Sequence, residues 1–456
     1  MKKLRSQLLA LTIAGAGLPV LAQTTYIFTQ APEVIYETGP LEIVTTSNGI
    51  GRILDKSRPV EPNSIPRPKF AIRSKDNKFI MSIGGKINPI IGYDLGNDLY
   101  DAPGGGVSFT TGNIPVPPQA GQKSAFFINP LSAYLDFTMI GFAGTANQVT
   151  GYIKLATNND SKGILLKRAY VTWRNTTVGM TQTLFQDGLA VQPPTIDPQG
   201  PCGDIGATAY QLAYKSPSYS GFAWGAGIEM PTFYSSNGVY RGKDYRHEYG
   251  GVSVTSEASQ KAPDVPAYIE YAASDQNRIR LSGILRNFFY RDLITSKTRY
   301  LAAWGASLSG NFSFYKPLTF NFQAAYGEGI ANYLQDISGR ALSFTPKDSE
   351  PGKMKANPMM GLVFGASYDM TSKLQFNAVG SYSRIWKVGD YATVGDLNGV
   401  AGNDNYKSAV YVAANCFYNI TSYLQVGIEY LYGRHYTWNM GGANDNRIQT
   451  QFQFTF

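Results

Sequence analysis

The last ten residues of the chain, Arg-Ile-Gln-Thr-Gln-Phe-Gln-Phe-Thr-Phe (447–456), alternate in polarity along their length. Successive side chains of an extended strand point to opposite faces, so Ile448, Phe452 and Phe454 share one face and the arginine and glutamines share the other. The first face needs an apolar environment, and the second needs water or polar partners. We therefore predict a β-strand that separates two such environments.

The same period of two recurs upstream. In residues 278–286, apolar side chains such as Leu281 alternate with polar ones such as Arg280, with Ile284 as the exception. Residues 319–326 show a similar alternation. We expect Leu281 to face outward and Arg280 to face inward. A soluble two-sheet sandwich would also place arginines on a wet face, so the alternation alone leaves both architectures open.

The connections between the predicted strands favour a membrane barrel. We place strands at 79–93, 125–137, 148–157, 164–174, 177–185, 207–215, 221–229, 266–273, 278–289, 299–311, 318–326, 359–368, 373–384, 407–418, 423–433 and 447–456. Connections such as 175–176 and 419–422 are short, whereas others, including 94–124, 186–206, 230–265, 327–358, 385–406 and 434–446, are long. Short turns at one end and long loops at the other are typical of transmembrane β-barrels, whereas a sandwich gives no reason for this division.

Composition agrees with this interpretation. The chain has no apolar run of about 18 residues, the length that a membrane helix requires. It contains 31 tyrosines and 24 phenylalanines, yet its mean hydropathy is slightly below zero. A barrel wall explains both observations, because apolar outward and polar inward residues average out. Aromatic residues near predicted strand ends fit an interfacial girdle, namely Tyr423, Tyr430, Tyr432, Tyr436 and Trp438.

The N-terminal segment has the features of an export signal. Lys2, Lys3 and Arg5 precede an apolar stretch that ends in Val20-Leu21-Ala22, which predicts a cleaved signal peptide at residues 1–22. Cleavage would leave 434 of the 456 residues and lower the formal charge from +8 to +5, a mild excess that does not indicate a nucleic-acid partner. Residues 23–72 are rich in proline and are predicted to form a partly extended periplasmic leader.

These features together predict an all-β fold, a transmembrane antiparallel β-barrel of about 16 strands with short periplasmic turns and long extracellular loops. The barrel would occupy residues 73–456 and lie in the cell outer membrane. A barrel of this size leaves an aqueous channel, whereas one of about eight strands is filled by side chains. An energy-coupled transporter with a plug would need about 22 strands, for which the chain is too short.

Three segments carry a resemblance to a known family. The terminal Phe456 on an alternating strand resembles the signal by which outer-membrane barrels are recognised by the barrel-assembly machinery. With the segment Lys-Phe-Ile-Met-Ser-Ile-Gly-Gly (78–85) and the segment 126–137, the chain resembles the DcaP-like trimeric porins from about residue 70 to its end. The resemblance implies a homotrimeric outer-membrane channel with an inward third loop. Residues 23–68 show no heptads, so the coiled coil found in some members is not expected here.

Alternation also assigns charged residues to the lumen. The predicted pore-lining basic residues are Lys86, Lys154, Arg168, Arg174, Arg278, Arg280, Arg286 and Arg299. The predicted pore-lining acidic residues are Asp136, Glu229, Glu270 and Glu429. Arg278, Arg280 and Arg286 share one strand face and are candidates for a positive stripe. Base exceeds acid, which predicts a weak anion preference.

The third long loop, residues 186–206, contains Asp187, Asp197 and Asp204 among several prolines. Prolines stiffen a loop, and a stiff loop can hold a fixed place in a pore. If it folds inward, its carboxylates would oppose the basic wall and create a transverse field at a constriction. If it stays outside, it is an ordinary surface loop. The sequence leaves both arrangements open.

No catalytic or metal motif is recognisable. His247 and His435 are expected to be solvated surface residues, and Cys202 and Cys416 are expected to be unpaired. Two acidic loops are candidates for a hard cation, but neither has a dedicated spacing, and turn formation explains them equally well. Their polar residues are Asp94, Asn97, Asp98 and Asp101 in one loop and Asp396, Asn403 and Asp404 in the other. We expect neither an enzyme nor a cofactor.

The predicted function is passive diffusion of small hydrophilic solutes through an outer-membrane porin with weak anion preference. A channel specific for a sugar or a dicarboxylate is an alternative, and a barrel enzyme or an adhesin is an alternative of another class. The expected partners are outer-membrane lipid, small hydrophilic solutes, the barrel-assembly machinery and further copies of the chain in a homotrimer.

Overall fold

The computed structural model describes residues 70–386 and 406–456 and the backbone of residues 34–38 and 41–45. Within these ranges it leaves out residues 77, 98, 102–105, 119–123, 131, 158–162, 189, 191, 236–237, 242–247, 250–251, 254, 257, 261, 275, 341 and 348–349. The predicted signal peptide, most of the leader, His247 and the acidic loop with Asp396, Asn403 and Asp404 lie outside the described residues.

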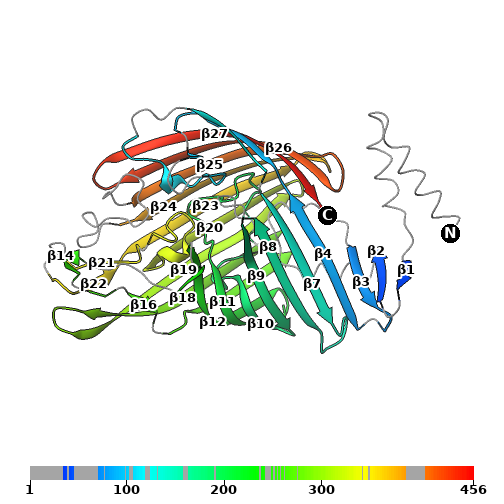
Figure 1. Cartoon of the computed structure of the whole chain (residues 1–456), viewed down its shortest axis with the longest axis horizontal. Helices are drawn as coiled ribbons and strands as arrows, with labels where there is room; N and C mark the ends of the chain where they lie inside the picture. The colour runs from blue at the N-terminus through cyan, green and yellow to red at the C-terminus, as the bar shows by residue number, and fades with distance from the viewer. Residues whose placement is uncertain are drawn as a thin grey trace.

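The chain forms a closed antiparallel barrel of 16 strands, as predicted (Figure 1). The first strand consists of β4 (Phe79–Ile87) and β5 (Ile90–Asp94), and the second of β6 (Ala125–Asn129) and β7 (Ala133–Gly141). The wall continues with β8 (Val149–Thr157), β9 (Ile164–Trp173), β10 (Thr176–Gln182), β11 (Thr208–Lys215), β12 (Phe222–Ser235), β17 (Val265–Ser274), β18 (Asn277–Asp292) and β19 (Lys297–Tyr315). It ends with β20 (Leu318–Glu328), β23 (Pro358–Asp369), β24 (Leu374–Ile385), β25 (Tyr406–Asn419), β26 (Leu424–Thr437) and β27 (Gly441–Thr455).

The barrel closes where β27 pairs with β5 and with the end of β4. Gly85 and Phe456 exchange two backbone hydrogen bonds, of 2.9 and 3.0 Å. The part of β4 that does not pair with β27 pairs with β3 (Phe70–Ser74). β3 pairs in turn with β2 (Leu41–Thr45), and β2 pairs with β1 (Val34–Thr38). Figure 1 shows these strands (blue) on the side of the molecule where the C-terminus lies. The described part of the leader therefore extends the sheet.

Smaller elements occupy the loops. They are β13 (Gly238–Arg241), β14 (Glu248–Tyr249), β15 (Val252–Ser253), β16 (Ser259–Gln260), β21 (Phe344–Pro346), β22 (Met354–Ala356) and the 3₁₀ turns η1 (Thr111–Asn113) and η2 (Ala331–Tyr333). None of the helices in the described part of the chain is long and apolar enough to cross a membrane. Cys202 and Cys416 are not bonded to each other, as expected.

Side-chain exposure confirms the alternation predicted for β18. Leu281 is 50 % exposed and Leu285 is 65 % exposed, whereas Arg280, the neighbour of Leu281 in the strand, is buried. Outward apolar residues meet lipid and inward residues meet the interior, because a strand has a period of two. The predicted register of this strand is therefore correct.

Several predicted strand boundaries differ from those in the structure. The segment 434–446 is a tight hairpin between β26 and β27, and β18 and β19 continue past the predicted limits of 289 and 299. β9 ends at Trp173, so Arg174 lies in a turn with a φ of 52°, and its guanidinium lies 4.8 Å from the Trp173 ring. Arg174 is not an inward strand residue, because the chain reverses at this position.

The interior of the barrel contains a hydrophobic core, which the prediction of an open aqueous lumen did not anticipate. Side chains from residues 95–118, 183–207 and 329–343 pack together and against inward residues of the wall. Phe109, Phe185, Ile205, Tyr333 and Leu334 are among its fully buried members. These three loops therefore fill part of the lumen.

A substitution on the outer face tests the assignment of the wall. Leu281→Arg should lower the free energy of unfolding by about 2 to 4 kcal/mol, because it places a charge on the lipid-facing surface of the wall. Urea titration of protein reconstituted in vesicles, followed by tryptophan fluorescence, measures this loss. Leu293→Arg, in the hairpin between β18 and β19, is the control and should cost little; equal losses for both variants would contradict the assignment.

Candidate functional site

The third loop, residues 183–207, leaves the wall after β10 and crosses the lumen before it returns to β11. Its beginning is fixed by Glu229 on β12, which accepts hydrogen bonds from the Thr183 hydroxyl and, at 3.0 Å, from the Leu184 backbone. Glu229 is buried. This predicted pore-lining acid therefore anchors the loop instead of facing solute.

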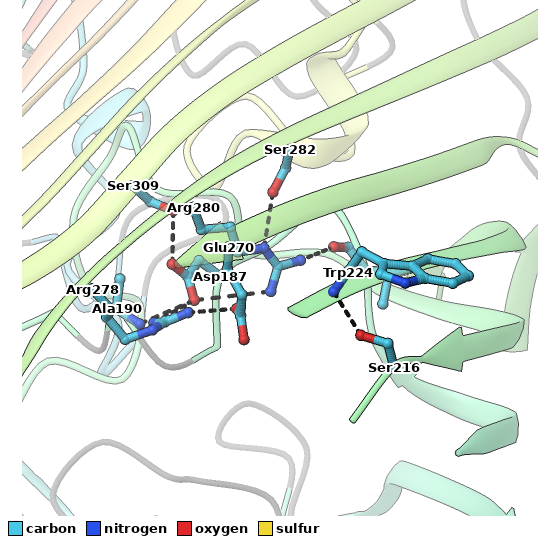
Figure 2. A network of polar contacts seen from close by, with 10 residues as sticks. Asp187, Ala190, Ser216, Trp224, Glu270, Arg278, Arg280, Ser282 and Ser309 are labelled. Carbon is cyan, nitrogen blue, oxygen red and sulfur yellow. Dashed lines mark hydrogen bonds and ion pairs between the residues drawn. The ribbon is translucent and has the colours of Figure 1, made fainter. Parts of the chain in front are cut away.

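Asp187 fixes the next part of the loop. Its carboxylate accepts hydrogen bonds from Arg278 and from Ser309, each at 2.8 Å, and Arg280 lies 3.9 Å away (Figure 2). Arg278 also pairs with Glu270 at 2.9 Å. Burial acts to raise the pKa of Asp187, but the two guanidinium groups hold it below its usual value. Asp187 is therefore a charged anchor.

The far part of the loop is held by the opposite wall. Glu429 on β26 accepts hydrogen bonds from the backbone of Ile196 at 2.9 Å and of Asp197 at 2.8 Å. The Asp197 carboxylate accepts from the backbone of Phe109 at 2.9 Å and from the Tyr411 hydroxyl at 3.0 Å. Glu429 is thus a second predicted lining acid that acts as an anchor, and Asp197 joins the third loop to residues 95–118.

A close contact between the backbone of the third loop and the wall is a further anchor of this loop. The Gly203 amide donates to Ser381 at 2.8 Å, and its carbonyl accepts from Gln323 at 3.1 Å. A Cβ on Gly203 would lie 2.5 Å from the Tyr382 carbonyl oxygen, and one on Gly361 would lie 2.1 Å from the Gly203 oxygen. Only glycine at both positions allows the loop to approach the wall this closely. The third loop is therefore folded inward, which the sequence had left open.

A second inward loop, residues 329–343, reinforces the third. The Tyr333 hydroxyl oxygen lies 3.0 Å from a Glu229 carboxylate oxygen and 2.7 Å from an Asp264 carboxylate oxygen, so its one proton is shared between these two acceptors. Asp336 accepts from Thr111 and from the Gly112 backbone, both at 3.0 Å. Sequence reasoning treated this segment as an ordinary long loop. The signal it carries is its run of apolar residues, which is unusual for an exposed connection.

A cavity of about 450 Å³ remains between the third loop and the wall strands β4, β7, β8 and β9. Its basic lining residues are Lys86, Lys154, Lys167 and Arg168, and its acidic lining residues are Asp187, Asp197 and Asp204, all from the third loop. Lys154 and Arg168 are cross-strand partners, and Lys154 lies 3.8 Å from the centroid of the Tyr134 ring. Opposite charges thus face each other across the cavity.

Only some of the residues that the sequence predicted to line the pore reach the cavity. Lys86, Lys154 and Arg168 line the cavity, together with Lys167, which sequence reasoning missed because it is the extra residue at a bulge in β9. Asp136 lies on the inward face beside Lys154 as its cross-strand partner. Burial of Asp204 raises its pKa to about 7.

The proposed positive stripe on β18 needs correction. Arg278, Arg280 and Arg286 point inward, but they are buried and engaged, and none of them lines the cavity. Arg286 pairs with Asp264 at 2.9 Å, and both side chains are fully buried. Arg299 pairs with Asp292 at 2.6 Å, toward the outer end of the barrel. A buried arginine requires polar or charged partners, so the inward loops recruit the three arginines of β18 as anchors, whereas Arg299 pairs within the β18–β19 hairpin.

The candidates for other chemistry also change. His435, expected at the surface, is buried, and its Nδ1 lies 2.9 Å from the Ile114 carbonyl oxygen. Asp94 pairs with Arg447 at 2.5 Å and so serves as a structural partner instead of a cation ligand. Among the described residues, no cluster of three or more His, Cys, Asp or Glu side chains could hold a metal ion.

A closed barrel of 16 strands with its third loop across the lumen is the architecture of the outer-membrane porins, and it supports the predicted outer-membrane location. No family model matches the chain, and no curated protein matches it in sequence. The fold is similar to that of the outer membrane channel DcaP of Acinetobacter baumannii, with a TM-score of 0.66 and 17% identity over 84% of this chain and 99% of that one. An anion-selective porin from Comamonas acidovorans gives a TM-score of 0.50 and 10% identity over 83% of this chain and 100% of that one. The resemblance to the DcaP-like porins is thus confirmed for the fold.

Removal of an anchor should loosen the third loop. Arg278→Ala leaves Asp187 without its closest cation, and breaking a buried pair in this way costs about 3 to 5 kcal/mol. We expect a larger and noisier single-channel conductance in planar bilayers, with the folded barrel band still present on gels of unheated samples. Arg291→Ala, an outward substitution on the same strand, is the control. A conductance trace identical to that of the unsubstituted protein would show that Arg278 does not hold the loop.

Proposed function

We propose that the protein is an outer-membrane porin through which small hydrophilic solutes diffuse passively. The observation that carries the proposal is the cavity beside the inward third loop, with cationic side chains on the wall and carboxylates on the loop. Opposed charges produce a transverse field that orients dipolar solutes, and the cations of the wall favour anions. Single-channel recording of purified protein in a planar bilayer tests it directly, and the absence of channels would overturn it.

The anion preference follows from how the charges are used. The buried arginines of β18 are neutralised by Asp187, Glu270 and Asp264, so they add little to the field that a solute meets. Four cationic residues and three carboxylates line the cavity, and one of these carboxylates, Asp187, is already paired with Arg278. Burial raises the pKa of Asp204 to about 7, which lowers its average negative charge near neutral pH. The balance supports a small net preference for anions.

A solute-specific channel is a second candidate. Seven amide side chains line the cavity, namely Asn88, Gln182, Gln186, Gln192, Gln199, Gln335 and Gln451. Amides can donate to and accept from the same solute, which favours recognition of hydroxyl-rich or carboxylate-bearing molecules. Tyr134 is the one aromatic residue among the described lining residues, so a stacking track for sugars is not supported. Saturation of the conductance by one solute would distinguish this candidate from a general porin.

We also propose a homotrimer whose barrels are recognised through Phe456 by the assembly machinery. The porin fold supports the trimer, and the pairing of Phe456 with Gly85 places the terminal residue at the seam that assembly must close. Cross-linking of the protein in native membranes tests the stoichiometry.

Neutralising the cations that line the cavity should change the anion preference of the channel into a cation preference. The triple variant combines Lys86→Gln, Lys154→Gln and Arg168→Gln. In this variant the three lining carboxylates face one remaining cation, Lys167. The zero-current potential under a salt gradient should move toward cation selectivity, most clearly below about 0.1 M salt, where the screening length exceeds about 10 Å. Lys373→Gln, in a short turn, is the control. No shift in the triple variant would place the conducting path elsewhere.

Selectivity should also depend on pH near neutrality. A carboxyl with its pKa raised to about 7 is charged above that pH and neutral below it, so anion preference should increase as pH falls from 8 to 6. Asp187, the other carboxylate that influences Asp204, stays charged in this range. Asp204→Asn should remove the pH dependence of the zero-current potential. A dependence that survives this substitution would assign it to another group.

A further inference from the structure

The outer face of the barrel carries two arginines at corresponding positions of two strands. Arg384 is the eleventh residue of β24 (Leu374–Ile385), and Arg434 is the eleventh residue of β26 (Leu424–Thr437). Both strands start after short turns, so both arginines lie toward the long-loop end, which faces the cell exterior in such barrels. A transmembrane β-strand crosses the hydrocarbon in about 9 to 11 residues. The two arginines therefore lie at the outer boundary of the membrane.

Register shows that both side chains point away from the lumen. Arg384 is the cross-strand partner of Ser408, and Arg434 is the partner of Val410, on the β25 strand between them. Ser408 and Val410 share a face with Val412, which is exposed, whereas Tyr411 is buried inside the barrel. Arg384 and Arg434 thus flank β25 on its outer surface, with their Cα atoms roughly 12 Å apart from the spacings of a sheet.

Aromatic rings support both guanidinium groups. The Arg384 Cζ atom lies 5.4 Å from the centroid of the Trp386 ring, and the Arg434 Cζ atom lies 4.6 Å from that of the Tyr436 ring. Within the described part of the chain, no carboxylate pairs with either group, and the Nε atoms of both are without a hydrogen-bond partner. Among the described residues, these two ring-supported cations therefore have no carboxylate as a counter-ion.

Below the arginines, small exposed side chains lie between larger ones on the outer wall, and we call this stretch the furrow. Its floor is made by the small exposed residues Ala378, Gly380, Val412 and Ala414 of β24 and β25. A Cβ on Gly380 would meet no atom within 4 Å. Larger exposed side chains border the furrow, with Phe364 on one side and Ile428 and Tyr430 on the other. From the arginines, the furrow residues continue toward the middle of β24 and of β25 (Tyr406–Asn419), which is the side of the membrane interior.

We propose that Arg384, Arg434 and this furrow bind a phosphorylated glycolipid of the outer leaflet, with its phosphate groups on the arginines and an acyl chain in the furrow. Arginine binds phosphate through two parallel hydrogen bonds, and basic residues near a membrane surface attract anionic headgroups. The separation of the arginines suits two phosphates on one headgroup. The site lies outside the barrel and is independent of the proposed channel.

The matched control for this site is Arg174. Its guanidinium also stacks on a tryptophan, Trp173, which is exposed on the outer face, but it lies in a short turn at the opposite end of the barrel. Arg174→Ala therefore removes the same kind of interaction at the inner boundary. Binding of the outer-leaflet glycolipid should therefore be unchanged in Arg174→Ala.

Native mass spectrometry of the full chain in detergent, with added rough lipopolysaccharide, tests the proposal. We expect the unsubstituted protein and Arg174→Ala to retain the lipid, Arg384→Ala/Arg434→Ala to retain at least about tenfold less, and Arg384→Lys/Arg434→Lys to fall between them. Phosphatase-treated lipopolysaccharide should bind the unsubstituted protein as weakly as intact lipid binds the double alanine variant. Conductance should be unchanged in every variant, which separates this test from that of the channel.

Two results would overturn the proposal. One is equal retention of intact lipid by the unsubstituted protein and the double alanine variant; the lysine variant, which preserves charge, provides the comparison if the alanine variant does not fold. The other is equal retention of phosphatidylglycerol and lipopolysaccharide by the unsubstituted protein, which would mean that the arginines attract any anionic headgroup.

Discussion

Closure of the sheet is the constraint on which the structure depends. Lipid offers no partners to backbone amides and carbonyls, so a sheet in a membrane must leave no edge. The pairing of β27 with β4 and β5 satisfies this requirement. Arg447 strengthens the seam, because it pairs with Asp94 on the first strand at 2.5 Å and donates to the Val107 carbonyl at 2.9 Å. One side chain thus joins the last strand, the first strand and an inward loop.

The interior follows from the width that closure imposes. A barrel of 16 strands is too wide for wall side chains to fill, so its loops decide how much of the lumen stays open. Here three loops share a hydrophobic core that includes Phe109, Phe185 and Tyr333. Burying their apolar side chains stabilises the inward arrangement by about 25 cal/mol per Å² removed from water. The remaining space lies beside β4, β7, β8 and β9, where none of these loops covers the wall completely.

Charges have two roles that depend on whether a loop covers them. Where loops pack against β18, the arginines are desolvated and must be paired, so Arg278 and Arg286 become anchors for Asp187 and Asp264. Where the wall remains open, Lys154 and Arg168 line the cavity and contribute to its field. Residues of one type thus differ in function because their solvation differs. This separation allows anchors and selectivity to be altered independently.

The sequence by itself determined the wall. Strand periodicity, loop lengths and the terminal phenylalanine predicted a closed barrel of about 16 strands and the outward face of Leu281, because lipid imposes a period of two that is visible in local sequence. It also placed Lys86, Lys154 and Arg168 on the inward face. The tertiary structure alone decided that the third loop folds inward, that Arg278 holds Asp187, and that residues 329–343 join the same core. These contacts connect residues far apart in the chain, and whether an inward charge anchors a loop or faces solute depends on burial by such distant segments, which no local pattern records.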